Sequence, residues 1–187
     1  SWCFHPVYRL RTYHRERIPL TGPVVVVANH SAAVDGPLLY GLFGRRAVFL
    51  IKHEMFRGPL GPVLRRLGQL PVQGGKPDRT SLLAALNVLQ RGGLVGVFPE
   101  GRRGAGDVAD AQQGAAWLAT RSRATVVPVA IRGTRRTARR RWRPWVDVLV
   151  GEPFELTTGT GRAALAVATE KVRTRLGGLV RELDSIR

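Results

Sequence analysis

Short uninterrupted apolar runs alternate along the chain with stretches in which apolar residues recur at helical spacing. A short run rich in β-branched residues, bounded by turn residues, predicts a strand that is buried on both faces. Runs of this kind cover residues 24–28, 47–51, 69–72, 94–98, 125–131 and 145–150. Residues 7–17 mix apolar and basic side chains, which fits a strand that enters the fold.

Helical spacing marks five segments, at residues 37–43, 58–67, 81–90, 109–121 and about 161–183. Thr80 is a predicted N-cap for the third segment, and Gly92 and Gly93 end it. The last segment carries one apolar stripe, which is expected to dock against a sheet. The stripe consists of Leu165, Ala168, Val172, Leu176, Leu179 and Leu183.

The alternation of strands and helices predicts an α/β fold, with a mostly parallel central sheet flanked by helices. The chain has 187 residues, of which 44% are hydrophobic, and this suits a single domain with a substantial core. In such sheets the chemistry tends to lie beyond the carboxyl ends of the strands. His30 and Glu100 each follow a predicted strand, so both are expected at the same edge.

The net charge of +17 favours an anionic partner, which nucleic acid, an acidic membrane or a phosphorylated substrate would satisfy. Seven arginines lie from Arg132 to Arg143, beside Trp142 and Trp145. Such a segment suits an anionic bilayer, a solvated loop or, less well, nucleic acid. No apolar run approaches the roughly 18–20 residues of a membrane span, and a single cysteine excludes an internal disulfide.

A histidine and an aspartate, His30 and Asp35, lie just beyond the run at 24–28. If a tight turn leads into a helix there, the carboxylate folds back onto the imidazole, fixes its tautomer and leaves the other ring nitrogen as a base. No serine has the setting of a nucleophile, so the base would act on a hydroxyl of the substrate. A metal site would need His53 or Glu100 as a third ligand, and no spacing supports one. A purely structural pair is the remaining alternative.

Three further segments follow the pair in order: G-Q-L-P-V at 68–72, F-P-E-G-R-R at 98–103 and V-P-V-A-I at 127–131. Together with the N-H-x4-D segment at 29–35, they resemble the four ordered blocks of the glycerolipid acyltransferase family, typified by 1-acylglycerol-3-phosphate acyltransferases. The resemblance covers about residues 19–150. The motifs lie in this core, and the amphipathic helix predicted at about 161–183 follows it within a single domain of residues 1–187.

The resemblance also implies roles for individual residues. His30, oriented by Asp35, would be the general base that takes a proton from a glycerol hydroxyl, which then attacks a thioester without an acyl-enzyme. Backbone N–H groups beyond His30 are candidates for stabilising the oxyanion. Glu100, Gly101, Arg102, Arg103 and Lys76 would hold the acceptor, with Arg103 on its phosphate, and Asn29, Phe98, Pro99 and Pro128 would support the motifs.

The sequence departs from the family pattern at three positions. Gly74 stands where an arginine usually contacts the acceptor phosphate, and Lys76 or Arg79 would have to replace that arginine. Arg102 replaces a threonine, and Gln112 replaces a lysine. Two alternatives therefore stay open: an acyltransferase for another lysolipid or a glycolipid, and an inactive basic module that binds membranes or nucleic acid.

The resemblance finally implies partners and location. The acceptor would be a lysophospholipid, the donor acyl-CoA or acyl-carrier protein, and the product phosphatidic acid, in phospholipid biosynthesis. No cofactor and no metal are expected. The protein is expected as a peripheral protein on the cytoplasmic face of a membrane, in contact with an anionic surface and not with nucleic acid.

Overall fold

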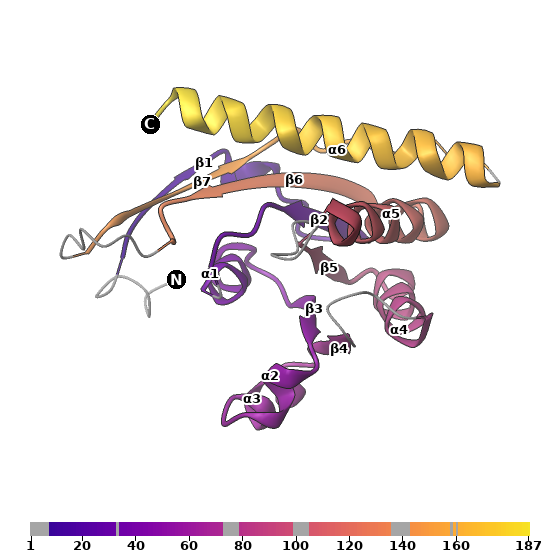
Figure 1. Cartoon of the computed structure of the whole chain (residues 1–187), viewed down its shortest axis with the longest axis horizontal. Helices are drawn as coiled ribbons and strands as arrows, with labels where there is room; N and C mark the ends of the chain where they lie inside the picture. The colour runs from indigo at the N-terminus through magenta and orange to yellow at the C-terminus, as the bar shows by residue number, and fades with distance from the viewer. Residues whose placement is uncertain are drawn as a thin grey trace.

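Seven strands form one twisted sheet in the computed structural model (Figure 1). The structure describes residues 8–32, 34–72, 79–98, 105–135, 143–157, 159 and 161–187. For residues 105–111 it describes the backbone only. The strand order is β1-β7-β6-β2-β5-β3-β4, and every neighbouring pair is parallel except β6 with β7. The predicted α/β fold with a mostly parallel sheet is therefore confirmed. The strands are β1 (Arg9–Tyr13), β2 (Val24–Ala28), β3 (Ala47–Lys52), β4 (Leu70–Val72), β5 (Leu94–Val97), β6 (Thr125–Arg132) and β7 (Trp145–Val150).

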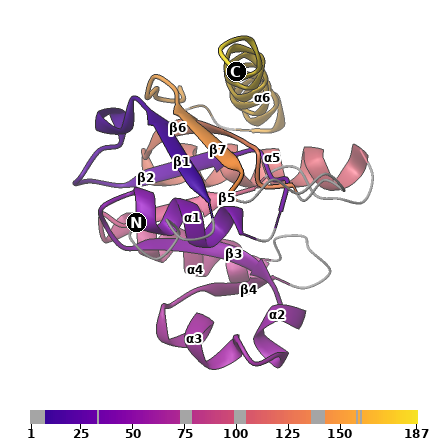
Figure 2. The same ribbon diagram turned by 90° about the vertical axis from the view of Figure 1, so that its left-hand side faces the viewer.

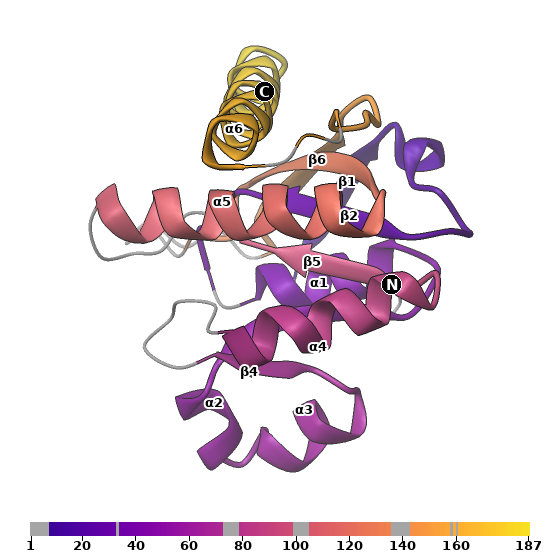
Figure 3. The same cartoon turned by 90° about the vertical axis from the view of Figure 1, so that its right-hand side faces the viewer.

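Helices cover both faces of the sheet (Figures 1 and 3). One face packs against α1 (Asp35–Leu42), and the other packs against α4 (Arg79–Gln90), α5 (Ala105–Ser122) and α6 (Arg162–Ser185). The four valines of β2 explain this arrangement, because Val24 and Val26 lie in the core beside α1 while Val25 and Val27 lie in the core beside α4 and α5. A strand that is apolar at every position needs cover on both sides.

The predicted helix at 58–67 is wrong in its boundaries, because the structure has two short helices, α2 (Glu54–Arg57) and α3 (Gly61–Arg66). Gly58 is extended between them, with φ −83° and ψ −178°. A residue that precedes a proline avoids the helical region, so Pro59 ends α2. The predicted cap at Thr80 is also wrong, since α4 already begins at Arg79.

The terminal elements are tied to the sheet. The stripe of α6 is buried against the sheet and α5 at Val172, Leu176 and Leu179, so its predicted docking is confirmed. Arg132 donates to both carboxylate oxygens of Asp184 on α6, at 2.7 and 2.8 Å. Arg132 therefore joins β6 to α6 through an ion pair, although in sequence it begins the basic segment at 132–143.

A 3₁₀ turn, η2 (Arg15–Arg17), follows β1, so the predicted strand at 7–17 is shorter than expected. Residues 136–142 of the basic segment lie outside the described residues. Within the described part of the chain, no helix has both the length and the apolar character that crossing a bilayer requires.

Candidate active site

Three adjacent parallel strands, β5, β2 and β6, end at one edge of the sheet. His30 lies two residues beyond β2, Phe98 directly follows β5, and Thr134 lies two residues beyond β6. The carboxyl ends of parallel strands are where open α/β sheets place their ligand sites. The topology thus gathers these side chains, which are far apart in sequence, at one edge.

His30 and Asp35 meet at this edge, as their sequence spacing suggests. The Asp35 N–H bonds the Ala32 carbonyl at 3.0 Å, which closes a turn that starts α1 at Asp35. The turn places Asp35 Oδ2 3.0 Å from His30 Nδ1. The N–H of the ring does not point straight at Oδ2, so the contact is a close polar one and not a linear hydrogen bond.

The ring nitrogen that faces Asp35 is buried, yet 30% of the His30 side chain is exposed. Nε2 is therefore the ring nitrogen available to a substrate. The Phe98 ring lies beside the imidazole, with ring centroids 4.7 Å apart, and Phe49 stacks behind Phe98 at 5.6 Å. These aromatic rings restrict the orientation of the imidazole and limit its contact with water.

Asp35 is fully buried. Burial alone would raise the pKa of its carboxyl, but four polar contacts outweigh burial and hold that pKa below its ordinary value of 3.8. In order of effect, the contacts come from the His30 ring, the Ala32 N–H, the Thr134 hydroxyl and the Ser31 N–H. Asp35 is therefore held as a carboxylate, which keeps a negative charge beside the imidazole.

Two of these contacts correct an expectation about the oxyanion. The N–H groups of Ser31 and Ala32 donate to Asp35 Oδ2 at 2.7 and 2.8 Å. They point toward the carboxylate and not toward a substrate. The expectation that the N–H groups beyond His30 stabilise an oxyanion is therefore wrong for these two residues.

Asn29 fixes the end of β2 against β6. Its side-chain amide donates to the Ile131 carbonyl at 2.9 Å, and its side-chain carbonyl accepts from the Ile131 N–H at 2.7 Å. Asn29 is fully buried, so the two bonds satisfy a polar side chain that would otherwise be costly to bury. Asn29, which was predicted to support the motif, thus clamps β2 to β6, the strands that precede His30 and Thr134.

Pro128 lies in the middle of β6 without disturbing the sheet. Its carbonyl accepts from the Gly151 N–H at 2.9 Å, on the side that faces β7. The nitrogen of a strand residue faces the same side as its carbonyl, and pairing with β7 starts only at Val129. The missing N–H therefore removes no bond to β2.

Thr134 is a site residue that the sequence reasoning missed. It is 2% exposed, and its hydroxyl helps lower the pKa of Asp35. Gly133 turns the chain before it with φ +91°, at a place where a Cβ would lie 2.1 Å from the Trp145 carbonyl oxygen. The Gly-Thr pair one residue after the fourth block was the available signal, but only the β2–β6 register shows which residue Thr134 approaches.

The predicted acceptor residues Lys76, Glu100, Gly101, Arg102 and Arg103 lie outside the described residues, as do Pro99 and Gly74. The chain enters 99–104 from Phe98, which contacts His30. Arg79, a possible replacement for the missing arginine, is exposed at the start of α4. Gln112 is 7% exposed, so the glutamine that replaces the usual lysine is buried.

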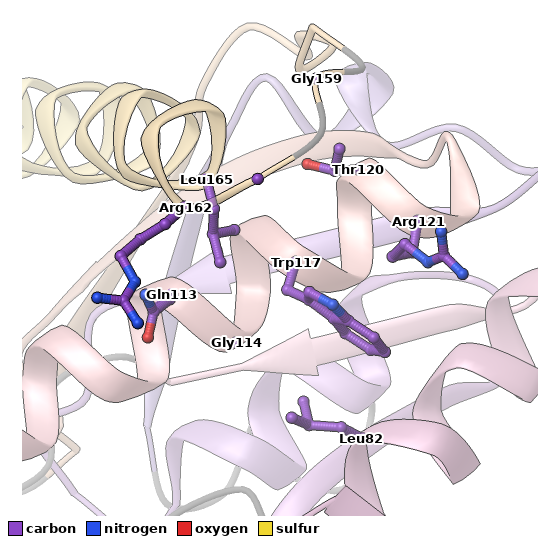
Figure 4. Close-up of a pocket in the computed structure, with 10 residues that line it drawn as sticks. Leu82, Gln113, Gly114, Trp117, Thr120, Arg121, Gly159, Arg162 and Leu165 are labelled. Atoms are coloured by element: carbon purple, nitrogen blue, oxygen red, sulfur yellow. The ribbon is translucent and has the colours of Figure 1, made fainter.

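No group of three His, Cys, Asp or Glu side chains suited to a metal ion occurs among the described residues. A cavity of about 540 Å³ lies between α4, α5 and α6, lined by Leu82, Trp117 and Arg162 among others (Figure 4). This cavity belongs to the face of the sheet covered by these helices, whereas Phe98 beside His30 packs with the core on the α1 face. The cavity is therefore separate from the His30 edge.

An imidazole with one nitrogen held by a buried carboxylate and the other accessible can accept a proton from a hydroxyl group. This is the chemistry of enzymes that make a substrate hydroxyl nucleophilic. A sequence model of the acyltransferase family matches residues 9–132, well over half of the chain. The chain therefore belongs to the acyltransferase family.

The relatives agree with this assignment. The chain is 26% identical, over 95% of its length, to a 1-acyl-sn-glycerol-3-phosphate acyltransferase of Bacillus subtilis, of which it covers 91%. It is 30% identical, over 71% of its length, to an N-acylphosphatidylethanolamine synthase of Arabidopsis thaliana, of which it covers 56%. Its fold matches the crystal structure of the 1-acyl-sn-glycerophosphate (LPA) acyltransferase PlsC of Thermotoga maritima, with a TM-score of 0.69, 28% identity, and coverage of 95% of this chain and 73% of that chain.

Proposed function

We propose that this acyltransferase moves a fatty acyl group to the free hydroxyl of 1-acylglycerol-3-phosphate and so produces phosphatidic acid for phospholipid synthesis. The donor is a thioester, acyl-CoA or acyl-carrier protein, and no cofactor takes part. The Bacillus subtilis relative and the Thermotoga maritima structure are both named as acyltransferases for this acceptor. The observation that carries the mechanism is the 3.0 Å contact between His30 Nδ1 and the buried Asp35.

In this mechanism His30 Nε2 takes the proton of the acceptor hydroxyl as its oxygen attacks the thioester carbonyl carbon. The new C–O bond forms, the C–S bond breaks, and the imidazolium returns the proton to the leaving thiolate. No residue of the protein is acylated. Asp35 keeps Nδ1 protonated and stabilises the positive charge that the ring gains during transfer.

Positioning supplies the rest of the rate. Glu100, Gly101, Arg102 and Arg103 hold the acceptor, and Arg103 contacts its phosphate because a guanidinium binds phosphate through two parallel bonds. Lys76 provides a second cation. The segment at 99–104 follows Phe98, whose ring touches the imidazole, and this continuity supports the assignment of the acceptor site to it.

The acceptor is a lipid, so the protein works as a peripheral protein at the cytoplasmic face of a membrane. Its net charge of +17 supports contact with an anionic surface.

The test is thiol release from palmitoyl-CoA or palmitoyl-carrier protein, with detergent-dispersed lysophosphatidate as acceptor. His30→Ala should abolish acceptor-dependent release. His14→Asn is the matched control, because His14 is exposed beyond β1 with φ 57°, a conformation that asparagine tolerates. Equal rates for His30→Ala and the unmodified chain would contradict the proposal.

A different acceptor is the second candidate, because glycine replaces the phosphate-binding arginine at position 74 and one relative is named for another lipid product. Activity with another lysolipid or a glycolipid, but not with lysophosphatidate, would establish it. If no acceptor supports release, the remaining reading is a basic binding module without activity.

A further inference from the structure

The two short helices α2 and α3 form a projection at one end of the sheet, which we call the α2–α3 hairpin (residues 53–67). In the three views of the whole chain it extends past β3 and β4, on the side away from α6 (Figures 1, 2 and 3). It starts directly after Lys52, the carboxyl end of β3. Because β3, β5 and β2 are parallel, the hairpin leaves the sheet at the edge that carries His30.

Apolar side chains are concentrated on the outside of this hairpin. Met55, Leu60 and Val63 are 40%, 55% and 53% exposed. They are three of the eight large apolar side chains that are exposed in the described structure, and the other five are far apart in sequence. Leu60 and Val63 are three residues apart, so they share one side of α3. A clustered apolar surface of this kind marks an interaction site.

Packing and a hydrogen bond hold the hairpin in place, so the exposure of its apolar side chains does not come from a frayed helix. Phe56 is 6% exposed and anchors α2. Its carbonyl oxygen accepts from Arg65 Nη1 at 3.1 Å, which joins α3 to α2. A Cβ on Gly61 would lie 2.1 Å from the same oxygen, so glycine is needed for the helices to come this close. The outer residues are therefore held outward.

Exposed basic residues alternate in sequence with the apolar ones. Lys52, Arg57, Arg65 and Arg66 are exposed, and Glu54 is the one acidic residue from 52 to 66. Arginine beside exposed leucine and methionine is the composition of a surface that inserts apolar groups below lipid headgroups and pairs its cations with anionic ones. An acidic protein partner would match the positive charge of the hairpin but would not account as well for its exposed apolar side chains.

We propose that the α2–α3 hairpin is a docking surface for an anionic lipid bilayer, in which Met55, Leu60 and Val63 enter the interface and Arg57 and Arg66 pair with lipid phosphates. The proposal rests on the proposed function in one respect, since it gives the lipid acceptor a route to the His30 edge. The binding itself does not require that function.

The first test is sedimentation of the full chain with sucrose-loaded vesicles of phosphatidylcholine containing about a third phosphatidylglycerol, at near-physiological salt. Leu60→Ser/Val63→Ser should weaken partitioning of the protein into the vesicles about tenfold. Each of these side chains is about half exposed, so each contributes about half of its transfer free energy to membrane insertion, and the variant loses this contribution. Leu83→Ser/Val167→Ser is the matched control, since these residues are 45% and 71% exposed on α4 and α6. The control should bind as the unmodified chain does.

Equal binding by the Leu60/Val63 variant and the unmodified chain would overturn the proposal, and so would an equal loss in the control. Arg57→Gln/Arg66→Gln should weaken binding to the anionic vesicles several-fold, with little effect on pure phosphatidylcholine vesicles. Loss of activity with acyl-carrier protein, together with unchanged vesicle binding, would identify the hairpin as a protein-docking surface and would also overturn the proposal.

A second readout separates this proposal from the proposed function. The Leu60/Val63 variant should keep its activity on detergent-dispersed lysophosphatidate and lose activity on the same lipid in vesicles. If the unmodified chain has no activity in either assay, the proposed function fails while vesicle sedimentation still decides the docking surface. If the variant loses both activities equally, the hairpin acts through the active site and the docking proposal is contradicted.

Discussion

Two aspartates in the described part of the chain are fully buried, and they have different partners. Asp147 on β7 accepts from Arg11 at 2.5 Å and from Arg187 at 2.9 Å, so two permanent cations tie β1 and the end of the chain to one carboxylate. Among the described residues, no arginine pairs with Asp35; two backbone N–H groups donate to it and the His30 ring lies against it. The charge of Asp147 is neutralised by two arginines that stabilise the fold, whereas the charge of Asp35 acts on an imidazole that can gain or lose a proton.

Removing each charge should therefore have opposite consequences, and this is the largest expected effect. Asp35→Asn should lower kcat by about 10³–10⁴-fold with small loss of stability, because an amide favours the wrong tautomer of the neighbouring imidazole. Asp147→Asn should lower the unfolding midpoint by several degrees and leave kcat of the folded fraction within about twofold. Thiol-release kinetics and thermal unfolding on both variants check the pair. The reverse pattern would break the distinction between the two aspartates.

The next largest effect concerns the clamp that places the site. Asn29→Ala should destabilise the fold by about 2–4 kcal/mol, since it leaves the buried N–H and carbonyl of Ile131 without their partners. Asn87→Ala, on the exposed side of α4, is the control and should change stability by less than about 0.5 kcal/mol. Urea unfolding measures both. Equal stabilities of the two variants would show that the clamp is not needed.

The sequence predicts the part of the site that is local. The valine run of β2 and the spacing of His30 and Asp35 are sufficient to predict a strand, a turn and a polar pair at one edge. Thr134 could not be predicted, because its approach to Asp35 depends on the β2–β6 register and on the turn at Gly133. The direction of the Ser31 and Ala32 N–H groups likewise depends on how the turn closes.

A similar limit applies to the fold. Periodicity predicts the long helices and buried strands well, since the burial of a stripe or a run decides them. It fails at 58–67, where a single proline and the close approach at Gly61 divide one apparent helix into α2 and α3. Local backbone geometry overrides the apolar spacing there.

Removal of the Thr134 hydroxyl should have a smaller effect than loss of Asp35. Thr134→Val should lower kcat/KM about tenfold, because the hydroxyl that helps to keep the pKa of Asp35 low is lost. Thr134→Ser keeps the hydroxyl and should restore most of the activity. A structural role alone would make the serine variant, which also loses a buried methyl group, the less active of the two.

The smallest effect is on acid stability. The pKa of Asp35 is lower in the folded protein than its ordinary 3.8, so the unfolded chain binds its proton first as the pH falls. The stabilisation from this group is therefore complete above pH 3.8 and is lost as the pH falls through the lower folded pKa. Urea unfolding of the unmodified chain and Asp35→Asn at a series of pH values should show their difference shrinking in this acid range. A constant difference would show that the Asp35 pKa is not lowered by folding.

The central claim is that Asp35 acts on catalysis only through His30, and a double-mutant cycle tests it most directly. The measurement is kcat for acceptor-dependent thiol release by the unmodified chain, His30→Ala, Asp35→Asn and the double variant. The account predicts that the double variant is no slower than His30→Ala alone, since a carboxylate that orients a base has no effect once the base is gone. Losses that multiply in the double variant would show that Asp35 and His30 act independently and would contradict the account.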